Sequence, residues 1–257
     1  VVHLGSIFGA VAGGLVMHRY GPETCLWLMA AGDFGQMLIC RRLIRDGKVV
    51  HVNAGQDEKS ARRGWHGTAR VVLKLCFVML VFDFSAHLVS PFFSVHWEQV
   101  SGIADQAVSG AVFAIPGFVA LAAMLINRHG SAGGHRLLDR LQSNLLLGAT
   151  GLALQAVPQE AVMLAGRVLY GWALFQAIVK LEVSVFKLST PASYAVDYSL
   201  ANFFQNLGVL LASFAAGAIV GRWGAQLTFM LGAAGLLLAA LTDRVLLGVD
   251  RLGPAAG

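Results

Sequence analysis

Asp83 and His87 are two ionisable side chains that stand four residues apart inside a long apolar stretch. A spacing of four places both side chains on one face of a helix. A charge at membrane depth costs at least about 2.5–3.5 kcal/mol, so such a residue normally faces a cavity or a partner. Because a carboxylate and an imidazole can exchange a proton near neutral pH, the pair predicts proton coupling or cation binding. The alternative is a structural pair, or Asp83 held to a neighbouring helix.

Arg167 lies roughly 10 Å into another apolar stretch, at about 1.5 Å per helical residue. A guanidinium keeps its charge and binds carboxylates in a forked geometry, so we expect Arg167 to contact an anionic substrate group or to pair with an acid. Tyr170 and Gln176 follow on the same helix and could line the same surface, although packing also produces such a stripe. Asn202 and Asn206 share a face of a later helix, where they could bond across helices or touch substrate.

No catalytic constellation accompanies these residues in the sequence. It contains no G-x-S-x-G, no Walker loop and no H-E-x-x-H. Cys25, Cys40 and Cys76 show neither a disulfide pattern nor a C-x-x-C metal spacing. We therefore expect no catalytic residue, no metal, no cofactor and no enzymatic activity. An intramembrane enzyme remains an alternative, for which only Asp83 and His87 come close to a convergent site.

The composition identifies the elements that position these side chains. Of 257 residues, 56% are apolar or aromatic and 13% are charged, about half the usual charged share of ~25%. A soluble domain of this size needs more surface charge, so we predict an all-α polytopic membrane protein in a lipid bilayer. Apolar runs of near-membrane length predict eight spanning helices. They are residues 1–17, 22–43, 71–96, 106–126, 140–157, 160–183, 198–220 and 225–247.

The positions of the basic residues predict how these spans are oriented. Fifteen of the 19 Lys and Arg fall in or beside alternate breaks between the spans, and only Arg19 and Arg222 fall in the opposite set. The positive-inside rule places the fifteen in the cytoplasm and therefore predicts a cytoplasmic C-terminus. The net charge of +5 is thus an orientation signal, and we expect no nucleic-acid partner. The predicted location is the bacterial inner membrane.

The first and last two predicted spans are related by an internal repeat. When the chain is shifted by 203 residues, ten of the 29 positions from 4 to 32 are identical, against about three from composition alone. The matches include Arg19 with Arg222 and Gly21 with Gly224. Six spans separate the repeated pairs, which predicts two six-helix halves related by an axis along the membrane normal.

A glycine ladder near the beginning of the sequence has the form Gly5-x-x-x-Gly9-Ala10-x-x-Gly13-Gly14. It resembles the fifth-helix antiporter motif of the major facilitator superfamily, with Ala10 in place of Pro. A spacing of four places glycines on one helix face, where a second helix can approach closely. The resemblance implies a hinge or seal between the two halves, and simple helix packing is the alternative.

A second stretch, Met163-x-x-x-Arg167-x-x-Tyr170-Gly171, resembles the arginine motif of that family's fourth helix, here in its C-terminal counterpart, the tenth. The resemblance covers nearly the whole chain as helices five to twelve, with helices one to four absent. It implies the last two helices of the N-terminal half at 1–44, a basic cytoplasmic loop at 45–70, the C-terminal half at 71–250 and a cytoplasmic tail at 251–257.

The function that the resemblance implies is secondary transport by alternating access. We expect proton-coupled export of a small organic molecule, either a drug-like compound or a siderophore. By the resemblance, half of the central cavity belongs to four N-terminal helices that this chain lacks, so we expect those helices to be needed as partners. A non-transporting fragment or scaffold is the alternative.

Overall fold

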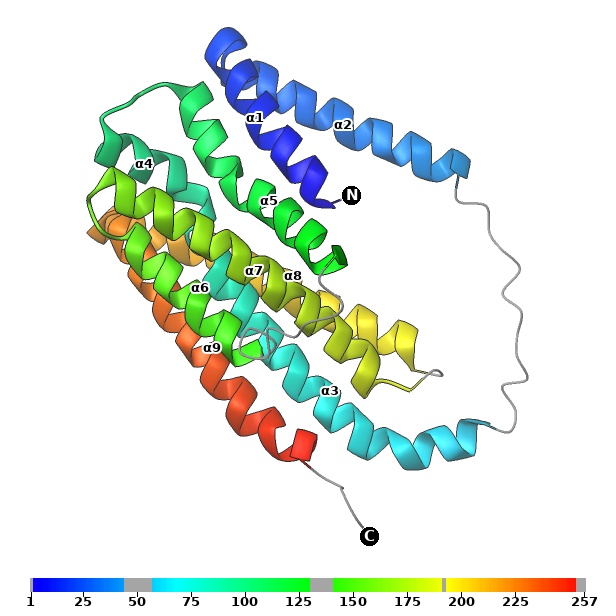
Figure 1. The fold of residues 1–257 in the computed structure, drawn as a ribbon. Helices are drawn as coiled ribbons and strands as arrows, with labels where there is room; N and C mark the ends of the chain where they lie inside the picture. Colours follow the sequence, from blue (N-terminus) through cyan, green and yellow to red (C-terminus); the bar gives the residue numbers. More distant parts are fainter. Residues whose placement is uncertain (1, 44–56, 130–140, 191–192, 253–257) are drawn as a thin grey trace.

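The computed structural model describes residues 2–43, 57–129, 141–190 and 193–252, and its regular elements there are all helices (Figure 1). In chain order they are α1 (Val2–Tyr20), α2 (Pro22–Leu43), α3 (Asp57–His87), the short 3-10 helix η1 (Ser90–Phe92), α4 (Phe93–Ser101), α5 (Gln106–His129), α6 (Leu141–Gln155), α7 (Glu160–Leu188), α8 (Tyr194–Trp223) and α9 (Gln226–Leu252).

Five helical stretches of the described chain are long and apolar enough to cross a membrane, which indicates an integral membrane protein. They are Arg70–Ser101, Gln106–Asn127, Glu160–Leu188, Tyr194–Trp223 and Gln226–Leu247. The eight predicted segments all fall on helices, but a membrane crossing by 1–17, 22–43 or 140–157 stays a prediction.

Two predicted boundaries differ from the structure. The single span at 71–96 is interrupted, because Ser90-Pro91 begins η1 and proline lacks the N–H that a continuous α-helix needs. The loop at 45–70 is also shorter than predicted, because α3 already begins at Asp57. The end of an apolar run cannot distinguish a polar helical turn from a loop, so hydropathy alone placed this boundary too late.

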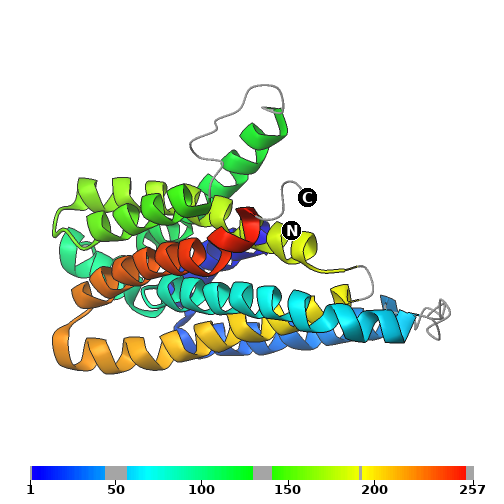
Figure 2. The ribbon, with the colours of Figure 1, turned by 90° about the horizontal axis from the view of Figure 1, so that it is seen from below.

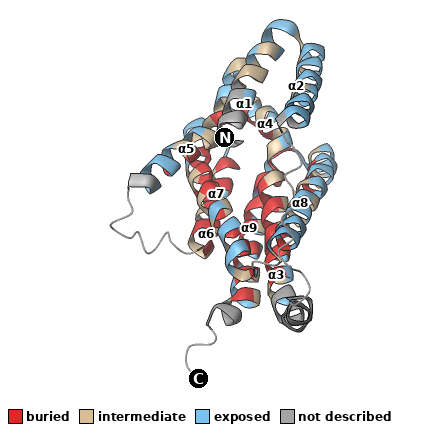
Figure 3. Cartoon of the chain, turned by 90° about the vertical axis from the view of Figure 1, so that its right-hand side faces the viewer, coloured by how far each residue is buried: buried red, intermediate tan, exposed pale blue. Residues whose placement is uncertain are grey.

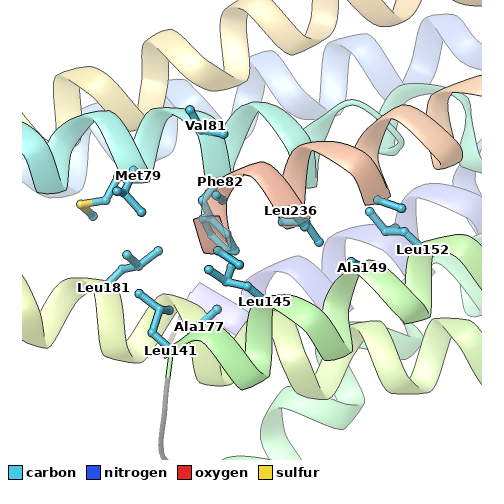
Figure 4. Packing of buried hydrophobic residues seen from close by; sticks show 14 of the residues in the cluster. Met79, Val81, Phe82, Leu141, Leu145, Ala149, Leu152, Ala177, Leu181 and Leu236 are labelled. Carbon is cyan, nitrogen blue, oxygen red and sulfur yellow. The ribbon is translucent and has the colours of Figure 1, made fainter. Parts of the chain in front are cut away.

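Most of the helices pack side by side in a bundle (Figures 1 and 2). α6 contacts α7 and α9, α3 contacts α8 and α9, and α5 contacts α7 on one side and α1 on the other. Phe82 from α3, Leu145 from α6 and Leu236 from α9 meet in the apolar core between these helices (Figure 4). The core therefore joins α3, α6, α7 and α9.

Glycines bring helix backbones into contact at the crossings. A Cβ on Gly151 of α6 would lie 2.7 Å from the backbone nitrogen of Tyr170 on α7. A Cβ on Gly208 of α8 would lie 2.6 Å from the carbonyl oxygen of Leu80 on α3. Small residues at such interfaces let helices approach closely, which is how helices associate in a membrane without a hydrophobic driving force.

Burial is uneven across the bundle (Figure 3). In the most apolar part of the stretch Arg70–Ser101, 61% is buried inside the protein, whereas in the most apolar part of α8 only 17% is buried. Phe203, Leu210 and Phe214 are among the large apolar side chains that α8 exposes. In a membrane protein such a helix face meets lipid or another helix rather than water.

The hairpins α1–α2 and α8–α9 turn in the same way. Each turns at a glycine with positive φ, Gly21 at +83° and Gly224 at +84°, a conformation that L side chains rarely adopt. Just before each glycine, an arginine lies over the next aromatic ring, 5.9 and 6.0 Å from its centroid. These pairs are Arg19 with Tyr20 and Arg222 with Trp223. The two hairpins thus share a turn geometry at the register of the sequence repeat.

Candidate functional site

A cavity of about 170 Å³ lies between α3, α5 and α7. His87, Arg167 and Tyr170, which the sequence singles out, are among the side chains that line it. The others are Ala86, Ser90, Phe113, Ala114, Pro116, Gly117, Ala120, Gly171, Leu174, Phe175 and Ile178. The structure therefore brings three of the predicted site residues, from two different helices, to one place.

Arg167 is 5% exposed and is held by aromatic rings and a carbonyl. Its guanidinium carbon lies 3.7 Å from the ring centroid of Phe93 and 5.2 Å from that of Phe113. Its Nη2 donates to the backbone carbonyl of Phe113 at 2.9 Å, and Nη1 reaches Oε1 of Gln155 at a long 3.5 Å. Desolvated contacts of a cation with ring faces are worth roughly 2 kcal/mol or more.

The charge of Arg167 has no anionic partner within the described part of the chain. No carboxylate there lies at ion-pair distance, and the Nε atom is buried without a hydrogen-bond acceptor. The sequence left open whether Arg167 pairs with an acid or contacts an anionic substrate group. The described residues do not show the pair with an acid. An arginine that lies beside a cavity and has no carboxylate partner favours the binding of an anionic ligand there.

Tyr170 and Gly171 set the spacing of the three helices around the cavity. The Tyr170 hydroxyl donates to the carbonyl oxygen of Ala86 at 3.0 Å, which joins α7 to α3. A Cβ on Gly171 would lie 2.6 Å from Cα of Pro116, so α7 and α5 touch through their backbones. Arg167 and Tyr170 are three residues apart, a spacing that places both on one face of α7.

Asp83 and His87 share a face of α3, as the spacing predicts. The hydrogen bond between them joins the His87 ring to the backbone of Asp83 and not to its carboxylate. Nδ1 of His87 bonds to the backbone carbonyl of Asp83 at 2.9 Å and lies 3.9 Å from the carboxylate Oδ1. His87 lines the cavity, whereas Asp83 is buried next to Gly208 of α8. Gln205 hydrogen-bonds to the Asp83 carboxylate, and Oδ2 has no partner among the described residues.

The remaining predicted site residues lie outside the cavity lining. Gln176 pairs with Asn127 of α5 through two side-chain hydrogen bonds of 3.3 Å. Asn202 and Asn206 are exposed on α8, where Nδ2 of Asn206 donates to the carbonyl oxygen of Asn202 at 2.7 Å. These two asparagines bond along their own helix, so the bond across helices that the sequence allowed is not formed within the described chain.

The glycine ladder makes one close contact among its described members. A Cβ on Gly14 would lie 2.8 Å from the carbonyl oxygen of Gln106 on α5, whereas Gly9 and Gly13 have nothing within 4 Å. The surroundings of Gly5 lie outside the described side chains. α1 and α5 belong to the two predicted halves of the chain, so Gly14 marks their contact.

Replacing Gly14 with Val is expected to separate α1 from α5, because the added carbon meets backbone atoms that cannot turn aside. Overpacking of this kind costs about 1–3 kcal/mol. The same change at Gly9 is the matched control, since it adds an equal side chain to the same helix in open space. Thermal unfolding of the purified chain in detergent should show a lower midpoint for Gly14→Val alone. Equal midpoints would show that the contact does not depend on Gly14.

Three residues that sequence reasoning missed complete the site: Phe93, Phe113 and Gln155. The two phenylalanines stand in apolar stretches where nothing distinguishes a cation-binding ring from a lipid-facing one. Nε2 of Gln155 donates to the backbone carbonyls of Gly151 and Gly166, and the backbone carbonyl of Gln155 accepts from Nε2 of His96 at 3.2 Å. As an amide near the end of an apolar run, Gln155 was the one with a recognisable signal.

In the described chain, no group of three or more His, Cys, Asp or Glu side chains is placed to hold a metal ion. No protein-family model matches the sequence, and no curated protein matches it either.

Proposed function

We propose that this chain forms part of a secondary transporter of the major facilitator type, which exports a small organic molecule in exchange for protons. The observation that carries the proposal is the buried Arg167 beside a cavity between three helices, without a carboxylate partner among the described residues. A purely structural buried cation is normally paired, whereas a substrate anchor stays without an anion until substrate arrives.

Asp83 is the proposed proton carrier. Its carboxylate is buried in α3, one helical turn from the cavity-lining His87, and one of its oxygens has no hydrogen-bond partner in the described chain. Such a carboxylate can accept a proton without breaking an existing bond at that oxygen. His87 lines the cavity and its Nδ1 lies 3.9 Å from Oδ1 of Asp83, so its ring can relay the proton.

The alternating-access part of the proposal rests on the repeated hairpins and the contact of α1 with α5. The hairpins share their turn geometry, as expected if α1–α2 and α8–α9 are counterparts in two six-helix halves. Rocking of one half against the other would then move α1 over α5 near Gly14. Four further helices would complete the first half, in the bacterial inner membrane with the C-terminus in the cytoplasm.

The proposal is tested by reconstituting the chain in liposomes, with and without a separately expressed four-helix segment, under an imposed pH gradient. Efflux of dyes, of hydroxamate or catecholate siderophores and of benzoate is followed in both preparations. Efflux only with the added segment supports the proposal. Efflux from these 257 residues alone would contradict the need for four further helices. No efflux in either preparation would favour a non-transporting scaffold.

A further inference from the structure

We propose that the cavity between α3, α5 and α7 binds the carboxylate of a small organic acid whose apolar body is about the size of one ring. As the substrate class of the transporter, this inference rests on the proposed function, whereas binding at the cavity can be measured without transport. The charge of the lining, the free hydrogen-bond donors of Arg167 and the size of the cavity all favour such a ligand.

The charge of the lining selects a monoanion. Among the described residues that line the cavity, Arg167 alone carries a permanent charge. One guanidinium neutralises one carboxylate, whereas a phosphate dianion would leave a second negative charge in apolar surroundings, at a high desolvation cost. The cavity therefore favours a carboxylate over a phosphate.

The guanidinium has donors to spare. Of its five N–H groups, the structure gives acceptors to two, the Phe113 carbonyl and the more distant Gln155 amide. A bound carboxylate supplies acceptors in the planar geometry that a guanidinium matches. Ser90 adds a hydroxyl to the same lining. Nδ1 of His87 already donates to the Asp83 carbonyl, so the free nitrogen of the neutral ring is an acceptor. Tyr170 already donates its hydroxyl proton to Ala86, so it can only accept.

The size and surface of the cavity select the rest of the ligand. Its volume of about 170 Å³ is close to the roughly 150 Å³ of a cavity that holds one benzene molecule. Most of the lining is apolar, and Phe113, Leu174 and Ile178 would contact the body of the ligand. A single ring or a short branched chain fits this space, and a larger ring system does not.

The test is equilibrium binding of radiolabelled benzoate to the purified full-length chain in detergent, with benzamide, inorganic phosphate and naphthoate as competitors. We expect saturable benzoate binding that excess unlabelled benzoate displaces. Benzamide has the same shape without the charge and should compete at least tenfold more weakly. Phosphate and naphthoate should also compete weakly. Equal competition by benzamide, or no saturable binding, would overturn the proposal.

Substitutions of Arg167 test whether benzoate binds at its guanidinium. Arg167→Gln should weaken benzoate binding at least tenfold, and Arg167→Lys should restore part of it, since lysine keeps the charge but loses the fork. Arg222→Gln, at the exposed end of α8, is the matched control and should bind as the wild type. Benzoate binding that Arg167→Gln leaves unchanged would overturn the assignment. If that variant does not fold, the comparison of benzoate with benzamide on the wild type decides alone.

The two proposals fail in different ways. Benzoate binding that depends on Arg167, without driven transport in liposomes, would overturn the transporter and leave the carboxylate site standing. Driven efflux of a dye or siderophore that saturating benzoate does not inhibit would overturn the carboxylate site and leave the transporter standing.

Discussion

Asp83→Asn is expected to abolish proton-driven transport in the complete transporter while the protein still folds. Asparagine has the shape of aspartate and can keep the hydrogen bond with Gln205, but it cannot take up a proton. The carboxylate is buried, so water does not substitute for it as a carrier. Driven transport should fall to the level of empty liposomes, and exchange of substrate without a gradient should persist.

The control for this prediction is Asp33→Asn on α2. Asp33 is also an acid within an apolar helix, but it is exposed and far along the chain from the cavity lining. We expect this variant to transport at the wild-type rate. Undiminished driven transport by Asp83→Asn would remove Asp83 from the proton pathway, whereas loss of both driven transport and exchange would point to a structural role.

The largest effect on stability is expected at the crossing of α6 and α7. A Cβ on Gly151 would meet the backbone nitrogen of Tyr170 at 2.7 Å, and one on Gly166 would meet the carbonyl oxygen of Gly151 at 2.7 Å. Because backbone atoms lie on both sides, neither helix can relieve the contact by a rotamer change. Gly151→Val and Gly166→Val should each lower the free energy of unfolding by about 3 kcal/mol, the upper end of ordinary overpacking.

The measurement is reversible unfolding of the purified chain in mixed micelles. Gly217→Val is the matched control, because it places the same side chain in the helix α8 with nothing within 4 Å. Its midpoint should stay within the range of ordinary surface changes. Losses of equal size at Gly151 and Gly217 would mean that the close approach of α6 and α7 does not set the cost, since helix propensity alone favours valine over glycine.

Sequence patterns predicted the positions of the helices better than they predicted which side of each helix packs against its neighbours. All eight predicted apolar runs fall on helices, and five helical stretches of the described chain are long and apolar enough to cross a membrane. The facing of Asn202 and Asn206 could not be predicted, since in a lipid-embedded helix both the packed and the exposed sides are apolar. The glycine ladder shows the same limit: its spacing identifies one face but not the neighbour, and only Gly14 among its described members meets one.

The sequence pointed to the ionisable residues at and next to the cavity but not to the aromatic side chains that contact them. Arg167, His87 and Asp83 are conspicuous because ionisable residues are rare in apolar runs. Phe93 and Phe113, which hold the guanidinium, are ordinary members of such runs. Their role depends on the packing of α4, α5 and α7 against one another, which no local sequence pattern predicts.

Pro116 lies in α5 close to the carbonyl group that accepts the hydrogen bond from Arg167. Proline lacks the N–H that would bond the Val112 carbonyl, so α5 is weakened at this turn. Arg167 donates to the next carbonyl along, that of Phe113. Arg167 therefore ties α7 to α5 at the turn where α5 has lost one backbone hydrogen bond. The first turns of α5, before Pro116, touch α1, so a bend of α5 at Pro116 would change the position of α1 relative to the cavity.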